Sequence, residues 1–523
     1  MAAQRGEAAD YYSNTGSEYV NGQQGYPPQQ GYPPTEEQKS QQQPPQYGYQ
    51  PPPNGEKQTF EQAFKLDKPK WNDVWAGILF IVVFLGYTAV SGIALHGYSS
   101  NSARTGNGIY GASSLALDNN TIILFAFVLA VAIVLSYGYV WLARMFTKQF
   151  IWVTGILNIV FAFVTAIYML SRKYYSGGIV FLIFAVFAAF CFWTWIKRIP
   201  FSVLMLQTAI DVSKNFGHVY LVSFLAGLLA TAFGAWYSVT LVAIYVHYEP
   251  GNNPACNTGA GGGCSSGKVI GLIVFVTFAM YWISETLKNL THVTISGVYG
   301  SWYFCQNNFP KGATRGALKR SLTYSFGSIS FGSLIVAIIN FLRQLCSVAR
   351  QQEAAQGDMV ASICFCVLGC LIGILDWAVS FLNRYAFSHI ALYGKAYIPA
   401  AKDTWTMIKQ RGIDALVNEC LIGPVLTMGA TFIAYACALL AYLYVVFTDP
   451  AYNKDGGFTP VIVAFAFLVG LQIANIFTTP LSSGIDTIFV ACAWDPEVLM
   501  RDHPDMYARM VSVYPQVQQA IHA

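Results

Sequence analysis

The chain has 523 residues, of which 54% are apolar and 11% are charged, and its formal net charge is +4. So small a charged fraction excludes an ordinary soluble domain. The Lys and Arg residues are spread along the chain, which argues against nucleic acid as a partner.

Apolar runs long enough to cross a bilayer recur from residue 72 to residue 490. A membrane-spanning helix needs about 20 predominantly apolar residues. The runs are continuous, unlike the alternating pattern of strands in a membrane barrel, so an all-α bundle is predicted. The ten expected spans are 72–95, 121–143, 150–171, 177–196, 217–247, 268–303, 326–348, 359–383, 421–448 and 458–490.

The loop charges predict that both termini are cytosolic. With that orientation the inner loops between spans carry fourteen Lys and Arg residues and the outer loops carry six, as the positive-inside rule requires. The expected organisation is a cytosolic tail over 1–68, a ten-helix membrane domain over 69–496 and a short cytosolic tail over 497–523. No cleavable signal peptide is expected, so the first span would act as signal and anchor. Residues 199–217 are too polar to span and are expected to form a helix along the inner face.

Residues 1–60 are rich in Gln, Pro, Tyr and Gly and contain few aliphatic side chains, so they are expected to be disordered. Pro44, Pro45 and Tyr47 match the PPxY ligand of WW domains, which bind polyproline II segments. This motif indicates a WW-domain ubiquitin ligase as a partner, although a Pro/Gln/Tyr-rich tail also produces such strings by chance.

Two outer loops contain candidate modification sites. Asn119 begins an N-glycosylation sequon close to the membrane. Cys256 and Cys264 flank a Gly-rich outer loop, where an oxidising exterior would permit a disulfide. The cysteines within spans are interpreted as packing residues, and no metal site is expected.

One face of span 268–303 is polar and aromatic. Its members fall within about 100° of arc on a helical projection, so they are expected to face the bundle interior. They are Trp282, Glu285, Asn289, His292, Ser296 and Tyr299. The alternative is a helix–helix seam in which Glu285 pairs with Lys288. His292 could be a proton-linked switch or could be held by a neighbouring hydrogen bond.

Two further spans carry polar faces. Span 458–490 presents Gln472, Asn475, Thr479, Ser483 and Asp486 on one side, and Pro480 is expected to break or kink this helix. Asp486 could instead mark the inner end of the helix. Span 359–383 places Asp376, Ser380 and Asn383 on one face. Buried polar groups in a membrane are costly, so these faces predict either a substrate path or structural pairs.

The sequence contains no convincing motif for enzymatic chemistry. Residues 262–268 spell GxxxxGK, but Val269 replaces the Ser or Thr of a phosphate-binding loop. The metalloprotease motif HExxH does not occur. We therefore expect no enzyme and no cofactor, and any transport would depend on a gradient.

Several ordered strings resemble the choline transporter-like family. They are GSISFGSLI over 327–335, LNRYAFSHIALYGKAY over 382–397 and DTIF over 486–489. HVTISGVYGSWYF over 292–304, together with the N-terminal tail, resembles the family's fungal branch, the pH-nine-sensitive proteins. The resemblance implies a ten-helix plasma-membrane protein that moves choline or a related solute without ATP. Animal members have a large outer domain where this chain has only residues 96–120, so properties of that domain do not carry over.

The leading hypothesis is a gradient-driven carrier for choline or a similar small organic cation. Glu285, Asp376 and Asp486 would balance the charge of the cation, and Trp282 and Tyr299 would supply cation–π contacts. The polar lining would come from Asn289, His292, Asn383, Gln472 and Asn475. The alternatives are a channel or lipid-translocating pathway, and a membrane scaffold or stress sensor that transports nothing.

Overall fold

The structure is a computed structural model, which describes residues 70–105, 119–171, 173, 175–248, 265–305, 310, 312–356, 359–410, 422–448, 459–513 and 515. Within these residues the regular structure is helical, and ten helices are long and apolar enough to cross a membrane. Pro44, Pro45, Tyr47, Cys256 and Cys264 lie outside the described residues, so the WW motif and the disulfide stay predictions.

The ten long helices confirm the predicted spans. They are α3 (Val74–Thr105), α4 (Asn119–Met145), α5 (Thr147–Ser171), α6 (Tyr175–Trp195), α8 (His218–Tyr248), α9 (Ser266–Phe304), α11 (Phe326–Gln356), α12 (Met359–Tyr393), α15 (Ile422–Thr448) and α16 (Thr459–Trp494). The shorter helices are η1 (Ile196–Arg198), α7 (Ile199–Asn215), α10 (Ala313–Leu322), α13 (Tyr397–Gln410), α17 (Pro496–Asp502) and α18 (Pro504–Val513). Asn119 is the first residue of α4, and its glycosylation stays a prediction.

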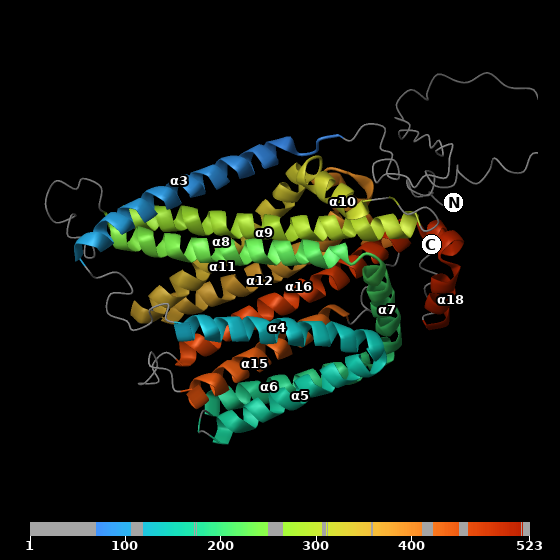
Figure 1. The fold of residues 1–523 in the computed structure, drawn as a ribbon, viewed down its shortest axis with the longest axis horizontal. Coiled ribbons are helices and arrows are strands. Elements are labelled where there is room, and N and C mark those ends of the chain that lie inside the picture. Colours follow the sequence, from blue (N-terminus) through green and yellow to red (C-terminus); the bar gives the residue numbers. More distant parts are fainter. Residues whose placement is uncertain are drawn as a thin grey trace, which may run out of the picture.

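α9 and α16 form the centre of the bundle. α9 packs against α3, α8, α11, α12 and α16, and α16 packs against α4, α8, α12 and α15 as well. α5 and α6 pair with each other at one edge (Figure 1). Large apolar side chains on the outward faces are exposed, as expected for a surface that contacts lipid.

The short helices gather at one end of the bundle. α7 and α18 lie across the end at which α9 and α16 finish, and α3 begins at the same end (Figure 1). We call this the α7 end. The prediction of a helix near 199–217 is confirmed, but most of its apolar side chains are buried against the bundle. Phe201 stacks on Phe489 with ring centroids 6.2 Å apart, so α7 is part of the core as well as of the surface.

Two local predictions differ from the structure. α16 is one continuous helix with Pro480 inside it, so the expected break is wrong. A proline removes a single backbone hydrogen bond, and packing of α16 on both faces can hold the remaining ones in place. Cys437 and Cys492 are buried packing residues as predicted, whereas Cys364, Cys366 and Cys370 are exposed on α12.

Candidate functional site

Two of the three predicted polar faces, those of α9 and α16, meet at His292 on α9, and residues of α12 outside its predicted face join them. His292 Nδ1 lies 2.9 Å from Ser483 Oγ on α16. Its Nε2 lies 3.0 Å from the carbonyl oxygen of Arg384 and 3.2 Å from Ser388 Oγ, both on α12. Both ring nitrogens therefore have partners, and one imidazole joins three helices. We call His292, Arg384, Ser388, Ser483 and Asp486 the polar junction.

Asp486 completes the polar junction on its α7 side. Its carboxylate lies 3.7 Å from Arg384 Nε, and its side chain is 9% exposed, against 48% for Arg384. A buried carboxylate needs such a partner, because desolvation of an unpaired charge is costly. The pair links α16 to α12 one turn beyond Ser483.

The other two predicted carboxylates also have basic partners. Glu285 pairs with Lys288 at 3.3 Å within α9, which is the seam alternative for this residue. Asp376 lies 3.7 Å from Arg343, so it links α12 to α11. In this conformation none of the three carboxylates is a free counter-charge for a cation.

Trp282, Asn289 and Asn383 lie in a seam that centres on α11. Trp282 Nε1 donates to the Ser330 carbonyl oxygen at 3.0 Å, and Asn289 Nδ2 donates to Ser333 Oγ at 2.9 Å. Asn383 Nδ2 donates to the carbonyl oxygen of Gly332 at 3.3 Å. α9 and α12 thus bond to the same turn of α11, which lies within the family-like string 327–335. These three side chains hold helices together.

Tyr299 is also a structural side chain in this conformation. It is fully buried, and its hydroxyl donates to the Ala209 carbonyl oxygen on α7 at 2.9 Å. Its ring lies so close to Gly484 that a Cβ added there would be 2.2 Å from the ring. The predicted cation–π role of Tyr299 would require this contact to open.

A cleft of about 430 Å³ with both polar and apolar lining residues lies between α8, α9 and α16. Its polar lining consists of Ser223, Ser284, Lys288, Thr291, Gln472, Asn475 and Thr479. We call this the central cleft. Gln472 and Asn475 were predicted as site residues, and the structure brings both to this cleft. Thr291 precedes His292 and Thr479 lies one turn before Ser483, so the cleft adjoins the polar junction on the side away from the α7 end.

The sequence analysis missed the contribution of α8 to the central cleft. Ser223, Gly227 and Ala230 recur at small-residue spacing and let α8 approach its neighbours closely. That spacing is visible in the sequence and indicates close helix packing. A helix with so few polar residues does not, however, suggest a binding site.

A second missed feature closes the α7 end beside α11. The Asp73 carboxylate accepts hydrogen bonds from Ser328 Oγ at 2.7 Å and from the Tyr397 backbone N–H at 2.8 Å. Asn72 Nδ2 donates to the Gly394 carbonyl oxygen at 2.7 Å. We call Asn72, Asp73, Ser328 and Tyr397 the N-terminal latch. The Tyr397 hydroxyl donates to Asn383 Oδ1, and burial raises the pKa of Tyr397 to about 12, so this hydroxyl stays a donor.

Comparison with known proteins shows the family. Residues 179–497 match the family described as plasma-membrane choline transporter. Protein PNS1 of Gibberella zeae is 66% identical over 89% of this chain and 86% of its own length. Protein pns1 of Aspergillus fumigatus is 63% identical over 88% and 87%, and Protein PNS1 of Saccharomyces cerevisiae is 41% identical over 88% and 87%. The chain therefore belongs to the choline transporter-like family, in the branch of the fungal PNS1 proteins.

Proposed function

We propose that this protein is a gradient-driven carrier of choline or a related small organic cation in the plasma membrane, with the α7 end in the cytosol. The observation that carries the proposal is the central cleft, whose polar lining comes from three helices that cross the membrane. The family match supports transport of the choline type.

The lining of the central cleft can solvate a small cation with neutral oxygens. Gln472 and Asn475 supply amide oxygens, and Thr291 and Thr479 supply hydroxyl oxygens. The Lys288 side chain is 70% exposed, so it can move away from Glu285 without passing through other protein atoms. An entering cation would then take the place of the Lys288 ammonium beside the Glu285 carboxylate, and the net charge of the site would be conserved.

Beyond the cleft, the polar junction and the N-terminal latch would act as the closed cytosolic gate. Passage toward the α7 end requires α9, α12 and α16 to separate at His292, which now bonds to both neighbours. The Asp486–Arg384 pair would part in the same step. Alternating access in carriers commonly moves one group of helices against another around a fixed site.

Uptake of labelled choline into proteoliposomes tests the proposal. Gln472→Leu and Asn475→Leu should each lower uptake about tenfold, as expected when a buried polar contact to a charged ligand is lost. Asn158→Leu is the matched control, because within the described part of the chain Asn158 bonds to Thr154 of its own helix alone, and it is not a lining residue of the cleft. Wild-type uptake by both cleft variants would contradict the proposed site.

The three ion pairs favour one alternative, a membrane scaffold or stress sensor that transports nothing. Glu285, Asp376 and Asp486 all have a basic partner, as structural carboxylates do. This alternative predicts no saturable uptake by the wild-type protein for choline or any other small cation in a substrate screen. Flux that does not saturate would instead favour a channel or lipid pathway.

A further inference from the structure

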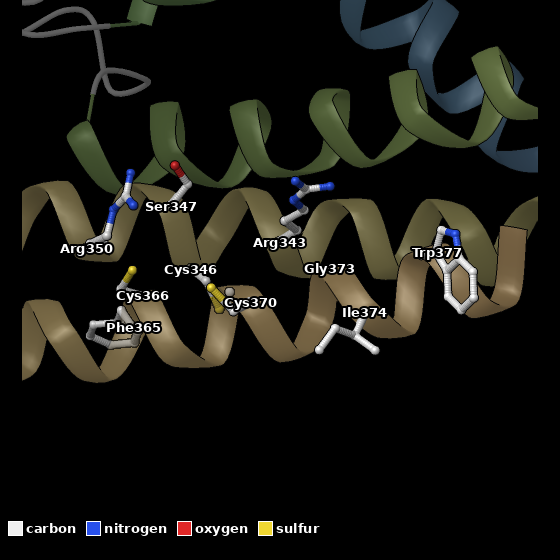
Figure 2. Close-up of a pocket in the computed structure, with 11 residues that line it drawn as sticks. Arg343, Cys346, Ser347, Arg350, Phe365, Cys366, Cys370, Gly373, Ile374 and Trp377 are labelled. Carbon is white, nitrogen blue, oxygen red and sulfur yellow. The ribbon is translucent and has the colours of Figure 1, made fainter. Parts of the chain in front are cut away.

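A second cavity lies on the lipid side of the bundle, in the groove between α11 and α12. Its volume is about 630 Å³. Figure 2 shows Arg343, Ser347 and Arg350 along α11 on one side, with Phe365 and Trp377 on α12 on the other. We call this the α11–α12 groove. It shares no lining residue with the central cleft.

The α11–α12 groove contains more positive than negative charge. Arg343 is partly neutralised by Asp376 at 3.7 Å. No salt bridge joins Arg350 to an acidic residue within the described part of the chain, and Glu353, one turn further along α11, is not among the lining residues. A guanidinium in a membrane-spanning helix is costly unless it finds a partner, so the groove favours an anionic group.

Arg350 lies near the end of its long apolar helix, where a lipid headgroup is expected. It is six residues before the end of α11, which corresponds to about 9 Å along the helix axis. This end of the hairpin is the one away from the α7 end. Arg343 lies two turns deeper, where a long side chain can extend toward the interface.

The α12 side of the groove is apolar and leaves space open. A Cβ added at Gly369 or at Gly373 would have no heavy atom within 4 Å. Ile374 and Trp377 are 63% and 69% exposed, so they form an apolar wall that faces the bilayer. A chain of methylene groups fits this wall, whereas a hydrated ion does not.

We propose that the α11–α12 groove binds a phospholipid from the surrounding bilayer. The phosphodiester group lies between Arg343 and Arg350, and an acyl chain runs past Gly373 along Ile374 and Trp377. Arg can bond a phosphate through two N–H groups at once, which favours the phosphodiester over an uncharged lipid. The proposal is independent of what the central cleft transports.

Thermal unfolding of the delipidated full-length protein in detergent tests the proposal. Dioleoylphosphatidylglycerol and dioleoylphosphatidylcholine, which share the phosphodiester, should both raise the unfolding midpoint. Dioleoylglycerol, which lacks the phosphate, and inorganic phosphate, which lacks the chains, should leave it unchanged. Equal stabilisation by dioleoylglycerol would reduce the groove to apolar packing, and equal stabilisation by inorganic phosphate would overturn the lipid assignment.

Two variants connect the lipid effect to the groove. Arg350→Gln should raise the apparent Kd for phosphatidylglycerol about tenfold, as expected for loss of a charge-assisted hydrogen bond. Gly373→Leu should abolish the effect by filling the groove, while the midpoint without lipid stays the same or rises, because Leu is a better helix former than Gly.

Lys268→Gln is the matched control, since it removes a positive charge at the same end of the bundle but outside the groove. It should keep the full lipid response. If Arg350→Gln and Gly373→Leu also keep it, the proposal is wrong.

Discussion

The two halves of the α11–α12 hairpin differ in how many of their side chains are buried. The half near the α7 end contains all the buried residues of both helices, from Gly327 to Ile339 and from Asn383 to Tyr393. The far half, from residue 340 to residue 382, has none among its described residues. Small and polar residues dominate the buried half, and large apolar residues such as Met359 and Val360 dominate the exposed half. In this membrane protein, the most hydrophobic residues contact lipid and the contacts between helices are made by smaller and more polar ones.

Glycine substitutions should show the largest difference in stability between the two halves. A Cβ at Gly332 would lie 2.5 Å from the Tyr397 ring and 2.7 Å from Phe387, and Tyr397 is held in place by its bond to Asn383. Gly332→Leu should therefore destabilise the protein by about 3 kcal/mol or more, since overpacking forces side chains and backbone apart. Thermal unfolding in detergent measures the loss. Gly369→Leu in the far half meets no neighbour, and a similar loss there would contradict the division.

Asn383→Leu should have an intermediate effect. It removes the donor to the Gly332 carbonyl oxygen and leaves the buried Tyr397 hydroxyl without its acceptor. The expected cost is about 1–3 kcal/mol of unfolding free energy. Leu371→Ala is the control from the far half, because Leu371 is 59% exposed, and it should change stability by about 0.5 kcal/mol at most. Equal losses for the two variants would mean that the seam contributes no special stability.

The smallest expected effect is a pH dependence of stability that comes from His503, just beyond the last span. It adds a titrating group to the comparison of buried and exposed regions. Burial lowers the pKa of His503 below its ordinary value, and its Nε2 lies 2.9 Å from the Tyr303 carbonyl oxygen. Above the unfolded pKa of about 6.5 the histidine is neutral in both states and contributes its full stability. As the pH falls from there toward the lower folded pKa, the unfolded state binds the proton first, so stability decreases.

His503→Gln keeps an N–H donor but cannot titrate in this range. The difference between its unfolding midpoints at about pH 8 and about pH 5 should be smaller than for the wild type. A wild-type pH response in this variant would remove His503 as the cause.

The sequence predicted the fold well because membrane spans are set by length and apolarity alone. It placed all ten long helices and the amphipathic α7 helix. The predicted break at Pro480 was wrong, because α16 continues as one helix through this residue. The packing of neighbouring helices that supports it cannot be seen in the sequence of a single segment.

The candidate site was harder to predict because a polar stripe has the same pattern whether it lines a cavity or a seam. Asn289 and Gln472 look alike in sequence, yet Asn289 bonds to Ser333 of α11 and Gln472 lines the central cleft. The difference depends on which helix lies opposite. The stripes of α9 and α16 did meet at His292, whose partners come from residues 92 and 191 positions further along the chain.

The place of the N-terminal latch in the chain has one further consequence. Residues 1–69 join the membrane domain directly before Asn72 and Asp73, which hold the start of α13 and the turn that follows α12. A partner that captured the tail would therefore pull on Asp73, and the strain would pass through Tyr397 to Asn383 within the bundle. Recruitment through the tail and the packing of the helices would then be mechanically connected through the Asp73 carboxylate.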